Sequence, residues 1–543
     1  MTTLARSDLC KFGGRGYPMK MVSALQALLF CILGISIATA QTNVTTYHYD
    51  NARSGQNTKE TILTPLNVNP TKFGKKFSVS VDGQIYAQPL YMSNLTISGG
   101  THNVVFVATE HDSLYAIDAD TGTVYWHASL LPFGGRTVTS SELGCGHITL
   151  QVGITGTPVI DSSTHTIYVL TKAKVNSTYV QYLHALDVVT HAEKFGGPVL
   201  IKASVTGTGD GNVGGRISFD AFFEHSRPGL LLENGHVIIA WASHCDNTPY
   251  HGWIMSYKAS TLAQEAVYNT TANGSDGGIW QSGSGGAADS NGNIFFVTGN
   301  GSFRSSQSNF GDTILKLGPP SSGKFPLADW FTPHNQGSLN GGDTDLGSGG
   351  VLLLPDLPAG SAHQHLLVQA GKEGTIYLID RSKMGHYCSG CTRDSQIVQE
   401  LPSALNSNFS APAYWNNTVY FWAEKDVLRA FSFNANGSGL LSASPVGKSA
   451  RSYPFPGATP VISANGTTNG IVWSVDTSAF ASGGQAVLHA HKASSVATEL
   501  YNSNQAANGR DHPGAAVKFA VPTVVNGKVY VGCAGKLTVF GLL

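Results

Sequence analysis

The sequence predicts an all-β fold, an eight-bladed β-propeller of four-stranded antiparallel blades. Three observations indicate it. The stretch at residues 115–126 reads as a strand, a tight turn at residues 120–122 and a second strand that ends in Trp126, and shortened copies of it recur along the chain. A small residue, usually followed by proline, and two apolar runs precede the copies. Because β-branched and aromatic runs bounded by turn residues are typical of strands, each repeat reads as four short strands, A to D.

The recurrence gives the number of blades. Copies of the strand C phrase lie at residues 183–190, 255–261, 377–382 and 488–494, and the strand A motif lies at residues 87–89, 156–158, 410–412, 458–460 and 520–522. Seven units are complete, and the eighth, at the C-terminus, has strands A to C beginning at Phe519, Lys528 and Lys536. Residues 76–81 match the missing outer strand D, so strands from both termini are expected to close the ring and remove free sheet edges. The alternative, an open solenoid, would require capping repeats.

The phrase Ala-x-Asp-x-x-Thr-Gly-x-x-x-Trp at residues 116–126 resembles the repeat of eight-bladed propellers of the quinoprotein alcohol dehydrogenase type, the pyrroloquinoline-quinone-like repeats. The resemblance covers about residues 70–543. It implies the fold, but both cofactor enzymes and scaffolds share the repeat. The dehydrogenases of this family carry an adjacent Cys-Cys pair over the quinone, and this chain has no such dipeptide and no Cys-x-x-Cys-His motif. The departure disfavours pyrroloquinoline quinone with calcium as the cofactor.

The N-terminus reads as an export signal. Basic residues precede an apolar stretch at residues 21–37, and Ala38-Thr39-Ala40 forms a small-x-small cleavage site before Gln41. The apolar stretch is shorter than the ~20 residues of a spanning helix, which disfavours the alternative of a retained anchor. We therefore expect a signal peptide at residues 1–40, a polar leader at 41–70 that lies against the ring, and the propeller at 71–543, with the mature protein periplasmic or extracellular.

Composition limits the partners. Charged residues make up 12% of the chain and the formal net charge is −1. Neither a nucleic-acid-binding stripe nor a polybasic membrane surface is indicated. We expect a monomer without a membrane span after cleavage, whose partner is a protein, peptide or glycan.

The cysteines of the expected mature chain read as disulfides, because an exported protein meets an oxidising environment. Cys388 and Cys391 are expected to form a local bridge, since no second pair completes a zinc site. Cys145 and Cys245 lie in comparable loops of consecutive blades and are candidates for a second bridge, which would leave Cys533 free.

Polar residues mark one face of the ring as the candidate site. The B-to-C turns and the D-to-A connections of four-stranded blades emerge on the same face. Histidine, acid, amide and cationic groups gather in them, and Trp241 and Trp422 lie nearby. The candidate ligand-binding residues are His111, Asp112, His147, His244, Asp246, Trp280, Gln281, Lys372, Glu373, Glu424, Asp476, Arg510 and Asp511. Aromatic walls with a few polar anchors are typical of binding pockets, whereas exposed hairpins also select Asp and Asn for turn geometry.

The function predicted from these features is an exported binding or scaffold propeller. The alternative is an enzyme that uses the same funnel, either a quinone-dependent dehydrogenase or a polysaccharide hydrolase or lyase. No catalytic residue and no metal site is assigned. Asp343 and Asp345 are potential calcium ligands, but acids beside Gly341 and Gly342 also suit a turn.

Overall fold

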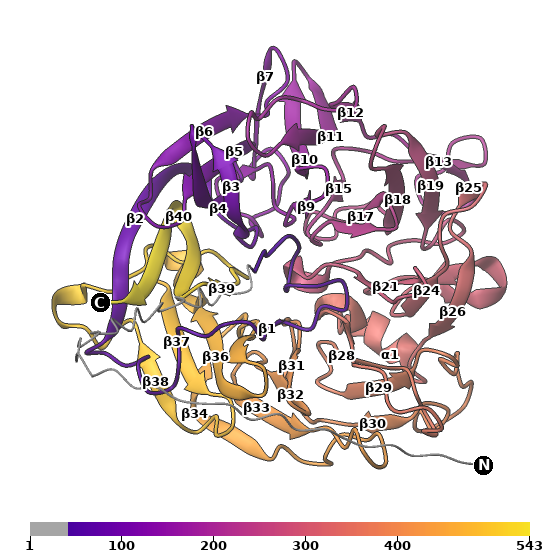
Figure 1. Cartoon of the computed structure of the whole chain (residues 1–543). Coiled ribbons are helices and arrows are strands. Elements are labelled where there is room, and N and C mark those ends of the chain that lie inside the picture. The colour runs from indigo at the N-terminus through magenta and orange to yellow at the C-terminus, as the bar shows by residue number, and fades with distance from the viewer. Residues whose placement is uncertain (1–41) are drawn as a thin grey trace, which may run out of the picture. The chain divides into compact units, whose positions relative to one another are not determined.

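The computed structural model describes residues 42–543, so the predicted signal peptide lies outside the described residues. These residues form eight β-sheet blades arranged in a ring (Figure 1). Helices are limited within the described chain to α1 (Gln336–Gly341) and five short 3-10 turns. The predicted eight-bladed propeller is confirmed.

The first four blades follow the strand order A to D from the centre outward. Their strands are β3 (Leu90–Ile97), β4 (Gly100–Thr109), β5 (Ser113–Asp118) and β6 (Val124–Ser129) in blade 1; β9 (Val159–Asp161), β10 (Thr166–Val175), β11 (Thr178–Asp187) and β12 (Val199–Leu200) in blade 2; β16 (Leu231–Glu233), β17 (His236–Ser243), β18 (Trp253–Lys258) and β19 (Gln264–Asn269) in blade 3; and β20 (Ala287–Ala288), β21 (Ile294–Val297), β24 (Ile314–Leu317) and β26 (Leu327–Phe331) in blade 4.

Three further blades repeat this order. Their strands are β27 (Leu352–Leu353), β28 (Leu366–Ala370), β29 (Ile376–Asp380) and β30 (Gln399–Leu401) in blade 5; β31 (Ala413–Trp415), β32 (Thr418–Phe421), β33 (Asp426–Ser432) and β34 (Gly447–Tyr453) in blade 6; and β35 (Val461–Asn465), β36 (Thr468–Asp476), β37 (Val487–Lys492) and β38 (Glu499–Asn502) in blade 7. Further short strands lie in the connections. β7 (Gly135–Thr139), β8 (Gln151–Val152), β15 (Glu224–His225) and β25 (Gly323–Lys324) extend the sheets of blades 2 and 3, and β13 (Ser204–Thr206) with β14 (Arg216–Ser218) and β22 (Phe303–Arg304) with β23 (Asn309–Phe310) form separate two-stranded hairpins.

Blade 8 joins the two ends of the propeller. β39 (Thr523–Val525) is its strand A, and the long bent β40 (Lys528–Leu542) supplies both strand B and strand C. β2 (Phe73–Gln84) pairs antiparallel with β40, from Phe73 opposite Leu542 to Gln84 opposite Ala534. The N-terminal strand therefore completes the last blade, as predicted, and the ring has no open edge at this seam.

The recurring phrase builds the turn and the contact between blades. The carboxylate of Asp118 accepts the backbone N–H groups of Asp120 and Thr121 at 2.8 and 2.7 Å, and Gly122 adopts φ +80°, which favours glycine. Trp126 donates its indole N–H to the carbonyl of Val188 in the next blade at 3.1 Å. These residues serve the blade architecture.

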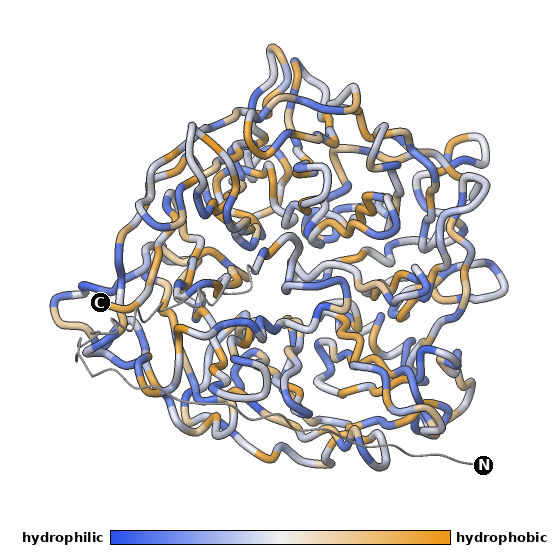
Figure 2. The backbone as a smooth tube through the Cα atoms, viewed as in Figure 1, coloured by the Kyte–Doolittle hydropathy of each residue, from blue (hydrophilic) through white to orange (hydrophobic). Residues whose placement is uncertain are grey.

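Tyrosines join neighbouring blades through a repeated hydrogen bond. The hydroxyl of Tyr168 donates to the carbonyl of Ala259 at 3.0 Å, and that of Tyr420 donates to Ala493 at 3.0 Å. Apolar side chains of adjacent sheets pack around these contacts, and Figure 2 shows that hydrophobic segments run through the blades. Most of the core therefore lies between blades, where apolar burial contributes about 25 cal/mol per Å².

Residues 44–60, which we call the strap, cross the centre of the ring and contact the innermost strand of every blade (Figure 1). Backbone hydrogen bonds join Val44 to Tyr91, and the carbonyls of the strap accept N–H groups from blades 2, 4, 5, 6 and 7. Side-chain amides of Asn51 and Asn57 reach the carbonyls of Leu232 in blade 3 and Val524 in blade 8 at 2.8 and 3.0 Å. β1 (Gln56–Asn57) also pairs parallel with β35.

No helix within residues 42–543 has the length and apolar character required to cross a membrane.

Candidate functional site

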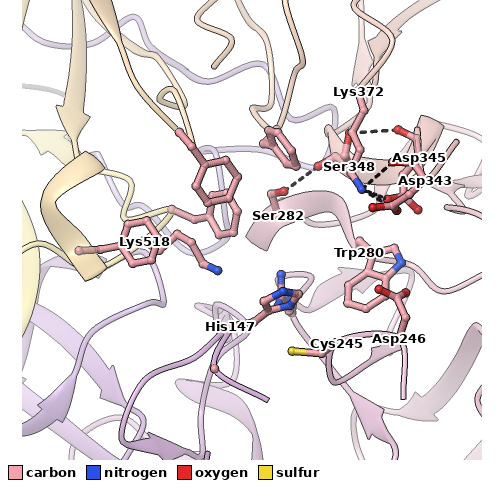
Figure 3. A pocket seen from close by; sticks show the side chains of 16 residues that line it. His147, Cys245, Asp246, Trp280, Ser282, Asp343, Asp345, Ser348, Lys372 and Lys518 are labelled. Carbon is pink, nitrogen blue, oxygen red and sulfur yellow. Dashed lines mark hydrogen bonds and ion pairs between the residues drawn. The ribbon is translucent and has the colours of Figure 1, made fainter. Parts of the chain in front are cut away.

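A cavity of about 500 Å³ lies where the D-to-A connections and B-to-C turns meet (Figure 3). Blades 2 to 8 contribute side chains to its wall through these loops. The lining residues are Gly146, His147, Arg227, Cys245, Asp246, Trp280, Ser282, Asp343, Asp345, Ser348, Lys372, Phe409, Phe455, Phe480, Lys518 and Phe519. Its volume falls within the range of small-molecule pockets.

Two buried cations in this wall have no hydrogen-bond or ion-pair partner within the described part of the chain. Arg227 is 6% exposed, and its Nε and Nη2 atoms have no hydrogen-bond partner among the described residues. Lys518 is 4% exposed, and within residues 42–543 its ammonium makes no hydrogen bond or ion pair. Burial, with a smaller effect of Arg227, lowers the pKa of Lys518 to about 7. Two such groups on one cavity are suited to an anion, because an unpaired buried charge is costly.

Aromatic rings surround the cations. The Arg227 guanidinium lies 5.3 Å from the centre of the Trp280 ring, and the Lys518 ammonium lies 5.3 Å from the centres of Phe480 and Phe519. Phe455 lies at 5.8 Å from the same ammonium. Cation–π attraction accounts for part of the cations' stabilisation. The combination offers aromatic walls with two positive charges over their rings.

The opposite side of the cavity is acidic but compensated. The Lys372 ammonium contacts carboxylate oxygens of Asp343 at 2.9 Å and Asp345 at 2.6 Å (Figure 3). Burial opposes the charge of Lys372, but Asp345 and Asp343 raise its pKa. Asp246 accepts the hydroxyl of Tyr250 at 3.0 Å, and burial raises its pKa.

A disulfide stands beside His147 in the same wall. Cys145 and Cys245 are bonded, with their Cα atoms 5.6 Å apart, and they join the connection into blade 2 to a turn of blade 3. His147 is exposed, and partial desolvation together with the nearby Arg227 lowers its pKa to about 4, so the imidazole is neutral at physiological pH. Cys388 and Cys391 form the second disulfide, and Cys533 is the free cysteine of the described chain.

The strap forms part of the inner end of the site. A smaller cavity shares Arg227, Ser282 and Phe519 with the main pocket, and Tyr47 of the strap lines it. The strap therefore lies in the centre of the ring at the inner end of the pocket.

Four of the thirteen predicted residues line the cavity: His147, Asp246, Trp280 and Lys372. The others do not line it and have partners or burial of their own. His111 contacts Gln151, Asp112 accepts the backbone N–H of Lys172, and His244 accepts the Lys172 ammonium at 2.7 Å. The remaining six are Gln281, which is buried; Glu373, which accepts from Asn335 and Tyr377; Glu424, which pairs with Lys425; Asp476, which accepts the N–H of Ser478; and Arg510 with Asp511, which form an ion pair at 2.8 Å.

The placement of Trp241 and Trp422 near a funnel was wrong. Both side chains are fully buried within and between blades, where Trp241 donates to Gln181 at 2.8 Å and Trp422 stacks on Tyr453 at 3.9 Å between ring centres. Trp241 lies within β17 and Trp422 follows directly after β32, and both side chains turn into the core.

Sequence reasoning missed Arg227, Lys518 and the four phenylalanines. A signal for three of them existed. Phe409, Phe455 and Phe519 each stand just before the small-residue and proline motif that opens strand A of blades 6, 7 and 8. This repeated aromatic position places three rings around one mouth of the ring.

The cavity can be tested against the quinone that the resemblance implies. The orphaned Arg227 and Lys518 suit carboxylate groups, and the Trp280 ring suits a flat heterocycle. Asp343 and Asp345 suit a divalent cation poorly, because the Lys372 ammonium already compensates them. The residues thus fit a flat polycarboxylate and not its usual metal ion.

Comparisons with known proteins show the fold. No family model matches the chain, and no curated protein matches its sequence. The quinohemoprotein alcohol dehydrogenase of Comamonas testosteroni has a similar structure, with a TM-score of 0.58 and 15% identity, over 92% of this chain and 80% of that chain. A europium-containing methanol dehydrogenase has a TM-score of 0.58 and 12% identity, over 92% of this chain and 98% of that chain. Quinohemoprotein alcohol dehydrogenase ADHIIG from Pseudomonas putida HK5 has a TM-score of 0.57 and 12% identity, over 92% of this chain and 80% of that chain. The chain therefore has the eight-bladed propeller fold of the quinoprotein alcohol dehydrogenases.

Proposed function

We propose that this chain is an exported binding protein whose pocket takes a flat small molecule that carries carboxylate groups. The observation that carries the proposal is the pair of buried, unpartnered cations, Arg227 and Lys518, on one aromatic cavity. An anionic ligand would supply the missing hydrogen-bond acceptors. Hydrogen bonds to charged groups contribute about 1.5–3 kcal/mol each, so the two cations can provide a large part of the affinity of a small ligand.

The concave shape of the cavity and the burial of its two cations favour a small molecule over a protein surface. Protein partners usually bind through broad, flatter interfaces, whereas Arg227 and Lys518 are almost inaccessible from outside. A peptide or glycan would have to present its anionic group inside the cavity. Export is supported by the N-terminal signal pattern and by the two disulfides.

A quinone-dependent oxidoreductase is the second candidate. Cys245, which is bonded to Cys145, and the Trp280 ring line the same cavity. The structural neighbours named above are dehydrogenases. Arg227 and Lys518 would hold the carboxylates of such a quinone, and when bound it would supply the two-electron oxidant. The Lys372 ammonium between Asp343 and Asp345 favours binding without metal-assisted turnover.

Replacing Arg227 or Lys518 with methionine is expected to weaken binding of pyrroloquinoline quinone, the probe ligand, by about 10- to 100-fold, because each variant removes one charge-assisted contact. Affinity is measured by isothermal titration calorimetry and by quenching of tryptophan fluorescence, with and without calcium. Dye-coupled alcohol oxidation in the same samples separates the candidates: binding without turnover supports the binding protein, and turnover supports the oxidoreductase.

Arg510→Met is the matched control, because Arg510 pairs with Asp511 outside the cavity. Its affinity should equal that of the wild type. Equal losses in all three variants, or wild-type affinity in both pocket variants, would place the anion elsewhere.

Binding of a fully ionised carboxylate ligand should weaken as the pH rises above 7. The pKa of Lys518 in the free protein is lowered to about 7 by burial, and a bound carboxylate raises it. Below pH 7 the ammonium is already charged, and above pH 7 binding must also take up a proton, so affinity falls by up to about tenfold per pH unit. Calorimetry from pH 6 to pH 8.5 tests this. Lys518→Met should remove most of the slope, and an unchanged slope in that variant would contradict the assignment.

A further inference from the structure

Blade 7 contains a cluster of side chains of the types that bind metal ions, and none of them lines the main cavity. His489 and His491 lie two residues apart on β37, so both point to the same face of the sheet, and Glu499 begins the neighbouring β38. One ring nitrogen of each histidine and one carboxylate oxygen of Glu499 lie within 4.8 Å of one another. The histidines are 1% and 2% exposed.

Each imidazole has one partnered and one free nitrogen. Nδ1 of His491 lies 2.9 Å from the carbonyl of Val496, which can only accept, so this nitrogen carries the hydrogen. Nδ1 of His489 lies 2.6 Å from the Glu499 carboxylate. The Nε2 atoms of both rings are buried without a partner. Because Nδ1 of His491 carries the hydrogen, its buried Nε2 offers a lone pair, and a buried lone pair without a partner is costly.

Blade 2 supplies an internal comparison. The phrase Leu183-His184-Ala185 occupies the same place in the repeat as Leu488-His489-Ala490, and His184 likewise contacts a carboxylate, that of Glu193, through Nδ1. There, however, Nε2 of His184 has the hydroxyl of Thr171 as its partner at 3.2 Å. The residue two positions on is Leu186, where blade 7 has His491. The second histidine and the orphaned nitrogens thus belong to blade 7 and are not a requirement of the fold.

We propose that His489, His491 and Glu499 bind a divalent transition-metal ion, with Zn²⁺ as the expected occupant. Two imidazoles and one carboxylate are a common zinc donor set. The carbonyl of Val496 on Nδ1 of His491 is the kind of partner that orients a metal-binding histidine. The Glu499 carboxylate would exchange its contact with Nδ1 of His489 for the ion, which would lie beside that nitrogen.

The surroundings indicate a structural role for this ion. Trp422 and Tyr453 of blade 6 lie against His491 and His489, with ring centres 5.5 and 5.2 Å apart. The ion would join strands C and D of blade 7 at its contact with blade 6. It would stabilise the folded chain in proportion to metal concentration, as any ligand of the native state does.

The test uses the full exported chain with its disulfides intact. The protein is stripped with EDTA, reloaded with Zn²⁺ and freed of excess ion, and bound zinc is measured by mass spectrometry beside thermal unfolding with and without Zn²⁺. Wild type is expected to retain one more equivalent of zinc than His491→Leu and to show a zinc-dependent rise in Tm that this variant lacks. Leucine is the residue of blade 2 at this position, and without metal it should raise Tm, because it removes an unpaired buried nitrogen.

A substitution of the carboxylate ligand and a control in blade 2 complete the test. Glu499→Gln preserves size but removes the charged ligand oxygen, and it should lower zinc affinity by at least about tenfold. His184→Asn in blade 2 is the control and should retain wild-type zinc content. Equal zinc in wild type and folded His491→Leu would overturn the proposal, as would a cobalt-loaded wild type whose visible spectrum matches that of the variant.

Discussion

Replacing Arg53 with methionine is expected to lower the free energy of unfolding by about 2–4 kcal/mol. The Arg53 side chain is fully buried in the strap and donates to the carbonyl of Gly286 at 2.8 Å, to the hydroxyl of Thr46 at 2.7 Å and to the carbonyl of Tyr47 at 2.8 Å. Each buried acceptor that loses its donor costs about 1–3 kcal/mol. Relief of the buried charge offsets part of the loss, since burial lowers the pKa of Arg53 to about 10.

Urea unfolding followed by tryptophan fluorescence measures the change. Arg216→Met is the control, because Arg216 makes two contacts to Ser204 on an exposed hairpin and should cost less than about 0.5 kcal/mol. Hydrogen exchange gives an independent readout. Amides of residues 44–60 should exchange faster in Arg53→Met while those of blade 7 stay protected, and a variant as stable as the control would show that the strap contributes little.

The blades could be predicted from the sequence because their signal is local and repeated. The Asp118 turn, Trp126 and the strand A prolines recur with the architecture, and strand D at Phe73–Gln84 carries the same pattern as its counterparts. The path of the strap could not be predicted. Its contacts are single hydrogen bonds to distant strands, such as Ser54 to Tyr414, and they leave no periodicity in the sequence.

The site was predictable as a face but not as a set of residues. Polar residues concentrate in the loops of that face, yet loop position does not decide whether a side chain turns toward the axis. His244 turns into the buried contact between blades 2 and 3, where Lys172 holds it, whereas Asp246, two residues on, reaches the cavity. Arg227 precedes Pro228 in a connection with no distinguishing pattern, and only the folded ring places it opposite Lys518.

Removing the disulfide between Cys145 and Cys245 by a double substitution to serine is expected to destabilise the protein by about 2–5 kcal/mol. The bridge closes a loop across a sequence separation of 100, for which the chain-entropy model gives ~4.7 kcal/mol. The same model gives only ~2 kcal/mol for the loop between Cys388 and Cys391, whose separation is 3. The double serine variant at those two positions is therefore a matched control with the same chemical change.

The first variant should also lose ligand affinity, and the control should not. Cys245 and Asp246 both have left-handed backbone, with φ of 53° and 54°, which non-glycine residues adopt at a cost, so the bridge helps to hold this turn. Asn247 adds one contact to the carbonyl of Leu143 at 2.9 Å, which alone is a weaker constraint. Without the bridge, the turn that places Asp246 in the cavity wall relaxes, and binding of the probe quinone should fall by about tenfold. Unchanged affinity in a destabilised variant would mean that the disulfide stabilises blades 2 and 3 without shaping the pocket.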